Sequence, residues 1–336
     1  METENIKCQS CGGTLRFEPN KQMLVCDYCN NEFKIEDIQN KDKENEEYCH
    51  NLNECRCQSC GASMVIDANI ASSTCVYCHS PITITSKLEG EIKPDKIIPF
   101  NYDIEQTKKI FLENVKKRKF IPKSYFNKEQ LNNIQGIYYP FWIVDIDLSA
   151  NATFSATKVS TWSNGSYRYT KTSYYNLDRS GDIHLEDVSS CAIKNVNKKM
   201  LEGIFPYPKD KHLDFNKSYL VGYKSHKRDL SKEDIHNDIY AKIKEYSIEQ
   251  LKSNISFYNT INVKSYNHNI HKDSWSYVFV PIYLLTYTKK DKTYTYAMNG
   301  YTGKVYGEYP ISIIKLLLTC LAILLAGVIL GLVVYL

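Results

Sequence analysis

The most apolar stretch lies at the end of the chain, where Leu316–Leu336 includes no charged side chain. A helix of that length measures about 32 Å, which matches a bilayer hydrocarbon core of roughly 30 Å. Lys304 and Lys315 precede the stretch, and positive charge favours the cytoplasmic side of a membrane. We therefore expect a single-pass cell-membrane anchor over residues 311–336 with the preceding domains in the cytoplasm, in preference to a buried helix of a soluble protein.

Helical periodicity appears in the stretches 103–118 and 231–246, and a shorter helix is expected over 128–134. The apolar face of the first stretch comprises Ile104, Phe111, Leu112 and Val115. The second stretch opens with a capping pair, Ser231 and Asp234. Its apolar face comprises Ile235, Ile239, Ile243 and Tyr246. Both helices are therefore expected to pack one face against a core.

From Gly136 onward the pattern is rich in tyrosine, threonine and β-branched residues, which is typical of strands. The expected strands are 138–148, 152–161, 166–176, 277–288, 292–298 and 304–309. Asn164-Gly165 and Asn299-Gly300 predict turns between them. The similar quartets Tyr139–Trp142 and Val280–Tyr283 are each expected to open a long apolar strand. Residues 93–310 are thus expected to form a tyrosine-rich α+β domain with antiparallel sheet, built from two related halves.

A spacing of C-x2-C-x14-C-x2-C occurs twice, so each cysteine of the second set follows its counterpart at one constant offset. The first set is Cys8, Cys11, Cys26 and Cys29, and the second is Cys57, Cys60, Cys75 and Cys78. This spacing is typical of a four-cysteine zinc ribbon. Glycine follows each first pair, at Gly12 and Gly61, where a tight turn benefits from the lack of a Cβ. We expect ribbons at 1–36 and 55–92, joined by a charged linker at 37–54.

Each spacer between the cysteine pairs accommodates two short strands and a turn. In the first ribbon we expect strands at 14–17 and 23–25, and in the second at 63–66 with a return through 73–74. Because all four ligands of each set are cysteine, no position is left for a reactive water, which predicts two structural Zn²⁺ ions. Disulfides and iron are the alternatives. Cys49, His50 and Cys55 lie between the sets and are interpreted as spectators.

Charge is divided unevenly along the chain. Residues 1–92 carry 8 Lys and Arg against 15 Asp and Glu, a net charge of −7. Residues 93–336 carry 34 against 23, a net charge of +11. Affinity for nucleic acid comes mainly from cations that meet phosphates. The acidic, cysteine-rich part is therefore poorly suited to bind DNA or RNA.

The common catalytic motifs G-x-x-x-x-G-K-[ST], H-E-x-x-H and G-x-S-x-G do not occur in the chain. His268 and His271 form an H-x-x-H in an asparagine-rich stretch, which we expect to be a solvated loop. Asp145 and Asp147 alternate along an expected strand, which favours a solvated or salt-bridged face over acid–base catalysis. We therefore expect a protein that is not an enzyme.

Several motifs occur together with the twin cysteine sets and the terminal apolar helix: Y-Y-P-F-W at Tyr138–Trp142, V-P-I-Y at Val280–Tyr283 and N-G-Y-T-G-K at Asn299–Lys304. In this combination the chain resembles a bacterial family of membrane-anchored proteins with a transcription-factor-IIB-type zinc ribbon. The resemblance implies zinc at the eight cysteines, and partners among phage-shock-type and flotillin-like (SPFH-domain) membrane-stress proteins. The chain departs from the family in lacking a charged tail after the anchor.

The favoured hypothesis is a membrane-tethered adaptor that recruits partner proteins at the cytoplasmic face of the bilayer. Confinement there would raise its effective concentration for a membrane partner. The alternative is a membrane-associated nucleic-acid-binding protein related to replication or transcription. Gly327 and Gly331 form G-x-x-x-G, which would permit a homo-oligomer through close approach of two membrane helices.

Overall fold

The computed structural model describes residues 3–4, 6–38, 54–56, 63–65, 70–74, 81–84, 93–122, 125, 128–194, 196–253, 255, 257–289 and 292–335. The chain folds as two compact units. Unit 1 comprises Met1–Pro140, Asn195–Arg228 and Phe279–Leu336, and unit 2 comprises Phe141–Lys194 and Asp229–Val278. Both are mixed α+β with antiparallel pairing, as the sequence predicts.

Unit 1 begins with a small antiparallel sheet of β2 (Leu15–Glu18), β3 (Met23–Cys26) and β4 (Glu32–Phe33). Glu18 pairs with Met23, so a tight turn joins β2 to β3. The strands expected at 14–17 and 23–25 are confirmed within one residue. Further along lie β5 (Glu54–Arg56), β6 (Ser63–Val65), β7 (Ile70–Thr74) and β8 (Pro81–Ile84).

The duplicated cysteine pattern is accompanied by a duplicated strand register. Three backbone pairings of the first copy recur in the second, displaced along the chain by the same number of residues as the cysteines. Lys7–Thr14 recurs as Arg56–Ser63, Leu24–Phe33 as Ser73–Ile82, and Val25–Glu32 as Thr74–Pro81. Because these paired residues lie outside the cysteine positions, the repeat extends beyond the ligand spacing.

The second copy differs from the sequence prediction in its pairing. We expected 63–66 to pair with 73–74. Within the described residues, β6 pairs with β5, whereas β7 pairs with β8 and with β13 (Lys224–His226). The buried Ser72 hydroxyl lies 2.8 Å from Ser225 Oγ and 2.9 Å from Tyr223 O. These contacts fix β7 as a strand of the larger sheet of unit 1.

That larger sheet has the strand order β1 (Thr3–Glu4), β8, β7, β13, β10 (Gln135–Asn164), β14 (Thr260–Lys289), β15 (Lys292–Asn299) and β16 (Val305–Gly307). A further pair joins β9 (Lys96–Ile97) to β12 (Leu213–Asp214). The pair β13–β10 is parallel, and β7–β8, β14–β15 and β15–β16 are antiparallel. The residues of β10 and β14 are divided between the two units.

The expected helix at 103–118 is α1 (Ile104–Lys116), which begins with a capping box of Asp103 and Gln106. Phe111 and Val115 are buried as predicted, but Ile104 is exposed and Thr107 takes its place on the packed face. The helix expected at 128–134 is the shorter α2 (Lys128–Leu131). The remaining short helices of unit 1 are α3 (Lys198–Ile204), η4 (Lys209–Lys211) and η5 (Lys217–Leu220).

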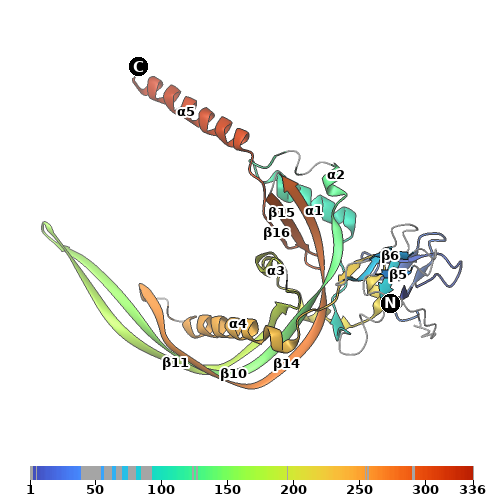
Figure 1. The fold of residues 1–336 in the computed structure, drawn as a ribbon. Helices are drawn as coiled ribbons and strands as arrows, with labels where there is room; N and C mark the ends of the chain where they lie inside the picture. The colour runs from blue at the N-terminus through green and yellow to red at the C-terminus, as the bar shows by residue number, and fades with distance from the viewer. Residues whose placement is uncertain are drawn as a thin grey trace. The chain divides into compact units, whose positions relative to one another are not determined.

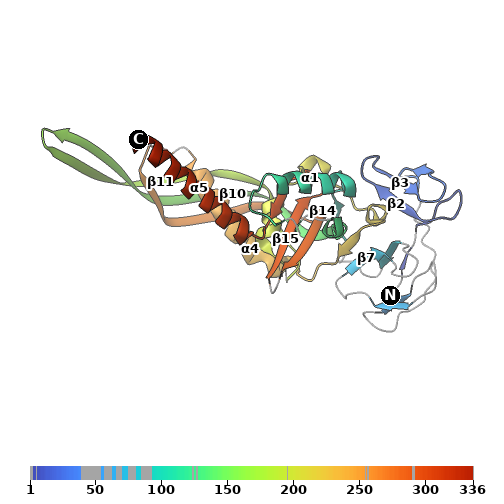
Figure 2. The same cartoon turned by 90° about the horizontal axis from the view of Figure 1, so that it is seen from above.

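The core of unit 1 is aromatic. Phe100 stacks on Tyr223 with ring centroids 4.1 Å apart, and its edge-on neighbour Tyr138 lies at 4.9 Å. Phe111 of α1 meets the fully buried Tyr296 of β15 at 4.7 Å, so α1 packs across the sheet (Figure 2). Aromatic pairs in such geometries are worth about 0.5–1.5 kcal/mol each beyond area burial. Many of the chain's tyrosines therefore stabilise the core.

Unit 2 consists of the long hairpin of β10 and β11 (Tyr167–Cys191), part of β14, and α4 (Lys232–Lys252). Helix α4 has the predicted capping box of Ser231 and Asp234. It lies along the sheet in Figure 1 and buries Ile235, Ile239 and Ile243 in the core of the unit, whereas the expected fourth apolar residue, Tyr246, is exposed.

Strand boundaries in unit 2 differ from those expected. The two strands predicted at 138–148 and 152–161 are one strand, β10, and the strand predicted at 166–176 extends to Cys191. The turn at Asn164-Gly165 is confirmed, since Asn164 pairs with Tyr167 and Gly165 has φ of 60°. The loop expected around His268 and His271 is wrong, because both residues lie within β14.

The quartets Tyr139–Trp142 and Val280–Tyr283 lie within β10 and β14 and do not begin these strands. They do mark where each hairpin begins. Pairing of β10 with β11 starts at Phe141, the third residue of its quartet, and pairing of β14 with β15 starts at Ile282, the third residue of the other.

The C-terminal helix α5 (Ile313–Tyr335) is the element expected to anchor the chain. Its segment Ile313–Leu330 has a mean hydropathy of 2.8 and none of it is buried. It is long and apolar enough to cross a membrane. At its start, Lys315 donates from Nζ to the carbonyl oxygen of Ile121 at 2.7 Å, which ties the helix to the loop after α1.

Candidate metal centre

The fold brings the first cysteine set together. The Sγ atoms of Cys8, Cys11, Cys26 and Cys29 all lie within 4.8 Å of one another. Cys8 and Cys29 are 3.6 Å apart, and Cys11 and Cys26 are 3.5 Å apart. Four sulfurs placed tetrahedrally at about 2.3 Å from a zinc ion would be about 3.8 Å apart, whereas a disulfide requires about 2.05 Å. The four free thiols therefore fit a metal ion in number, spacing and donor chemistry.

Two turns of the same construction hold the sulfurs. In the first turn, Gly12 N–H donates to Cys8 O and Cys8 N–H donates to Gly13 O, both at 2.8 Å. In the second turn, Asn30 N–H donates to Cys26 O and Cys26 N–H donates to Asn31 O, both at 3.0 Å. The residue after each pair is left-handed, with φ of 73° at Gly12 and 55° at Asn30. A Cβ on Gly12 would meet no atom within 4 Å, so backbone conformation explains this glycine.

The electrostatics of the cluster also favour a cation. Burial disfavours the thiolate of Cys8, but backbone N–H groups of Cys11 and Ser10 outweigh burial and lower the pKa of this thiol to about 6. The Gly13 amide favours the thiolate of Cys11, yet the sulfurs of Cys29 and Cys26 outweigh it and raise the pKa of Cys11 to about 12. One thiolate forms readily, whereas four require a bound cation to offset their repulsion.

The second cysteine set, Cys57, Cys60, Cys75 and Cys78, lies outside the described residues, as do Gly61, Cys49 and His50. The backbone of Cys55 belongs to β5, where it pairs with Met64. Most of the expected linker at 37–54 also lies outside the described part of the chain.

The first ribbon is docked onto the aromatic core of unit 1. Phe17 is 2% exposed and meets Tyr219 edge to face at 5.2 Å. Its N–H donates to the carbonyl oxygen of Val221 at 3.1 Å. Gln22, held at φ of 53°, donates from Nε2 to the carbonyl oxygen of Phe100 at 2.8 Å. The four-cysteine cluster is therefore held against the aromatic core of unit 1.

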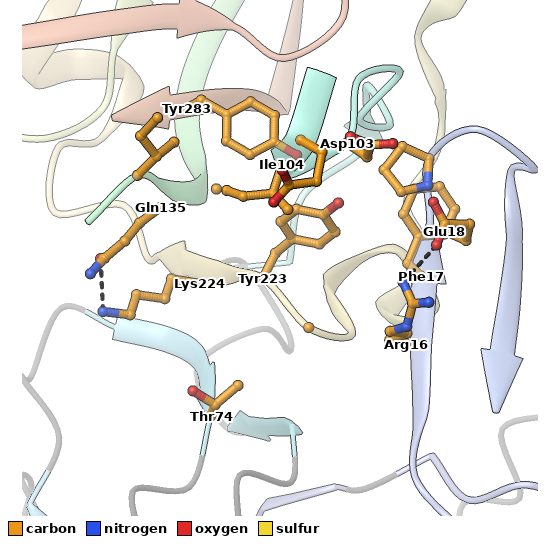
Figure 3. A pocket seen from close by; sticks show the side chains of 15 residues that line it. Arg16, Phe17, Glu18, Thr74, Asp103, Ile104, Gln135, Tyr223, Lys224 and Tyr283 are labelled. Carbon is orange, nitrogen blue, oxygen red and sulfur yellow. Dashed lines mark hydrogen bonds and ion pairs between the residues drawn. The ribbon is translucent and has the colours of Figure 1, made fainter. Parts of the chain in front are cut away.

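A cavity of about 660 Å³ lies beside this docking contact, lined by residues of the ribbon, α1 and β13 (Figure 3). Tyr223 and Tyr283 form one wall, and burial raises the pKa of both phenols, so they stay neutral donors. The polar groups at the rim pair with one another. Arg16 contacts Glu18 at 2.6 Å, and Lys224 donates to Gln135 at 2.9 Å. The described lining residues offer packing and hydrogen bonding, and among them no nucleophile lies beside a base.

The acidic residues noted in the sequence have local partners within unit 2. The strand register shifts between Val144 and Ile146, so a bulge lies at Asp145. Asp145 accepts the backbone N–H of Asp187 at 3.0 Å, and Asp147 lies 2.5 Å from His184. The carboxylate of Asp147, with help from Glu186, raises the pKa of His184. Asp147 is therefore part of a salt bridge, as the strand interpretation favours, whereas Asp145 binds the backbone at a bulge.

Phe17 and Gln22 make the contacts between the first ribbon and the aromatic core. The sequence alone does not indicate this role for either residue. From the sequence alone, a phenylalanine between two polar residues of β2 is expected to lie in the core of the ribbon itself. The left-handed turn residue Gln22 has no glycine or asparagine signature that would mark it. The partner groups, on Val221 and Phe100, lie in other elements that are remote in the chain, and no local signal links them to the ribbon.

Comparison with known proteins gives one informative result. No family model matches the chain, and no solved structure matches it. The chain is 30% identical over 308 residues to the uncharacterized protein YdjG of Bacillus subtilis (strain 168), covering 92% of this chain and 90% of that protein. The similarity therefore extends over nearly the whole length of both chains and is not limited to the cysteine motif.

Proposed function

The chain belongs to the same family as YdjG of Bacillus subtilis, and we propose that it is an adaptor that recruits partner proteins at the cytoplasmic face of the cell membrane. The observation that carries this proposal is a four-cysteine cluster docked on a folded unit whose last element is a helix long and apolar enough to cross a membrane. In this arrangement α5 spans the bilayer, unit 1 supports the ribbon, and the exposed parts of the ribbon meet the partner.

The metal is assigned as structural Zn²⁺ in both copies. Cys8, Cys11, Cys26 and Cys29 hold the first ion, and four cysteines leave no coordination position for a reactive water. Cys57, Cys60, Cys75 and Cys78 hold the second, which makes the chain a twin-ribbon protein. The recurrence of the strand register at the offset of the cysteines supports the second site, because the same backbone frame precedes and follows each cysteine pair.

The exposed part of the first ribbon has the chemistry of a protein-recognition surface. Tyr28, between the ligands Cys26 and Cys29, is 82% exposed, and its backbone is fixed by the turn that holds the metal. Tyrosine on a rigid support is a common anchor of protein interfaces. The net charge of −7 over residues 1–92 favours a basic protein surface over nucleic acid.

The partner class proposed is a membrane-stress protein of the phage-shock or flotillin-like (SPFH) type. This assignment rests on the sequence motifs that resemble the family of membrane-anchored twin-ribbon proteins. The proposal assigns no catalytic step to the chain. Self-association through Gly327 and Gly331 of α5 belongs to the same proposal, and replacing both with isoleucine should then abolish the oligomer in membranes.

The first test is metal content. The full-length chain should contain two zinc ions by elemental analysis, Cys8→Ser should contain one, and Cys8→Ser with Cys57→Ser should contain none. A chain that retains one ion at most, with no effect of Cys57→Ser, would contradict the twin-ribbon assignment.

The second test is crosslinking and mass spectrometry of the full-length protein in native membranes. A protein partner should be recovered with the wild type and with Lys292→Ser, an exposed position away from the ribbon, and should be lost with Tyr28→Ser. Retention of the same partners by Tyr28→Ser and by the double cysteine variant would contradict recognition through the ribbons. Recovery of nucleic acid with steep salt dependence, in place of protein, would favour a membrane-associated nucleic-acid-binding protein.

A further inference from the structure

The end of the β10–β11 hairpin in unit 2 has no core of its own. The buried positions of this face, Ala152, Phe154 and Ala156, end before Lys158. Every residue of 158–172 is exposed, although the strands remain paired as far as Asn164 and Tyr167. At roughly 3.4 Å per residue, the exposed part measures about 24 Å in β10 and about 20 Å in β11. A two-stranded ribbon without a packed face is marginal in water, so a surface that covers one side would stabilise it.

One face of this ribbon is aromatic and basic. Opposed residues of an antiparallel pair share a face. The pairs Lys158–Ser173, Ser160–Lys171, Trp162–Tyr169 and Asn164–Tyr167 therefore project to the same side. The rings of Trp162 and Tyr169 stack at 5.7 Å with 15° between their planes. We call Lys158, Trp162, Tyr167, Tyr169 and Lys171 the aromatic face.

The opposite side of the hairpin is different in chemistry. It carries the pairs Val159–Thr172, Thr161–Thr170 and Ser163–Arg168. Small hydroxyl side chains dominate there, whereas Trp162, Tyr167 and Tyr169 are 48%, 73% and 44% exposed on the aromatic face. This two-sided pattern provides a matched control position one residue away from each aromatic ring.

We propose that the aromatic face rests on the anionic surface of the membrane as a second, peripheral contact of the protein with lipid. This inference rests on the proposed membrane anchoring, because α5 would keep the hairpin close to a bilayer at high effective concentration. Residues 148–177 contain Lys158, Arg168 and Lys171 and no acidic residue, which suits the negative cytoplasmic leaflet.

The kind of apolar residue also favours a lipid interface over a protein groove. The aromatic face contains tryptophan and tyrosine and no leucine, isoleucine or phenylalanine. Trp and Tyr are enriched at the level of lipid headgroups, because their rings are apolar and their N–H and O–H groups reach polar atoms. Lysines beside them extend their ammonium groups toward lipid phosphates.

The test uses the full-length chain reconstituted in phosphatidylcholine vesicles that contain about 30% phosphatidylglycerol, a fraction that gives an anionic surface. The photoreactive residue p-benzoylphenylalanine is placed at Trp162 or, as the matched control, at Thr161 on the opposite face. A third variant carries it at Leu321 of α5, which is 54% exposed. After illumination, mass spectrometry measures the fraction of each peptide that carries a lipid adduct.

The expected result is a lipid adduct at Leu321 and at Trp162, with at least several-fold less at Thr161. Placing the probe at Tyr169 with Thr170 as its control should reproduce the contrast on the paired strand. Changing Lys158 and Lys171 to glutamine should lower the adduct at Trp162 about tenfold or more, because each cation near an anionic surface contributes to binding.

A lipid adduct at Leu321 with equal or negligible adducts at Trp162 and Thr161 would overturn the inference and leave the anchor intact. Adducts of Trp162 with protein or with added oligonucleotide in place of lipid would overturn it as well. No lipid adduct at Leu321 would overturn membrane anchoring, and the inference with it.

Discussion

Replacing Phe17 with alanine is expected to detach the first ribbon from the aromatic core of unit 1. Phe17 lies in β2, is 2% exposed, and contacts the rings of Tyr219 and Tyr223 at 5.2 and 6.4 Å. The hydrogen bond from its backbone N–H to the oxygen of Val221 does not depend on the side chain. The variant therefore tests side-chain docking and leaves the strand pairing in place.

The size of the effect follows from burial. Truncation of a buried phenylalanine costs about 3–5 kcal/mol, through lost transfer free energy and the cavity left behind. Phe17→Leu keeps most of the volume and should lose less than about 1.5 kcal/mol. The expected order is thus a large loss for alanine and a small loss for leucine. Tyr28→Ala, at a residue 82% exposed, should change local stability by about 0.5 kcal/mol at most.

Hydrogen exchange measured by mass spectrometry on the zinc-loaded, full-length chain in nanodiscs provides the assay. Amides of β2 and β3 should exchange roughly two to three and a half orders of magnitude faster in Phe17→Ala, since each 1.4 kcal/mol is about tenfold. Amides of α4, around Ile239 in unit 2, serve as the internal reference and should not change.

Two results would refute the reasoning. A loss below about 1 kcal/mol in β2 and β3, comparable with that of Tyr28→Ala, would mean that the docking contact contributes little. An equal loss around Ile239 would mean that the substitution acts on the whole chain and not on the ribbon.

Three further predictions concern single positions. Gly12→Ala should weaken metal retention by about 1–2 kcal/mol, seen as faster transfer of zinc to a competing chelator, because φ of 73° is strained for alanine although space is free. Gly300→Ala should destabilise unit 1 by about 1–3 kcal/mol in hydrogen exchange, because its Cβ would lie 2.6 Å from the Phe100 ring. The pKa of His184 should be above its usual value by NMR and should fall in Asp147→Asn. Because this pKa is raised in the folded state, the stability that it contributes is present at acidic pH and is lost as pH rises through the raised pKa.

The helices of the fold were predictable because their signals are local. Ser231 and Asp234 form the capping box of α4, and Ile239 and Ile243 follow at helical spacing in the core. These features need no information from the rest of the chain. Tyr246 is the exception, since it continues the helical spacing and yet is exposed. How far a face is covered depends on the elements that pack against it, and helical spacing alone does not report them.

Strand boundaries were less predictable because a neighbouring strand decides them. Ser149, Ala150 and Asn151 interrupt an apolar alternation and suggest a break between two strands. In the structure they pair with 180–182 of β11, so the ladder continues through them. His268 and His271 similarly belong to a polar stretch that reads as a loop, yet pairing makes it part of β14. Tertiary hydrogen bonding overrides local propensity at both places.

The two cysteine-rich segments contact the rest of unit 1 in different ways, and this difference bears on the roles proposed for them. The first segment contacts the aromatic core through Phe17 and Gln22, and residues 3–4 before it add β1 to the edge of the larger sheet, but β2, β3 and β4 form a sheet of their own. The second copy supplies β7 to the larger sheet, where the buried Ser72 meets β13. If both cysteine sets hold a metal as proposed, its loss from Cys57 and its partners should disturb the larger sheet, whereas its loss from Cys8 and its partners should disturb mainly β2, β3 and β4. A segment that binds a partner must expose its surface without destabilising the domain that supports it. In the proposed function the first segment meets that requirement, and the second segment joins the pair to the rest of unit 1.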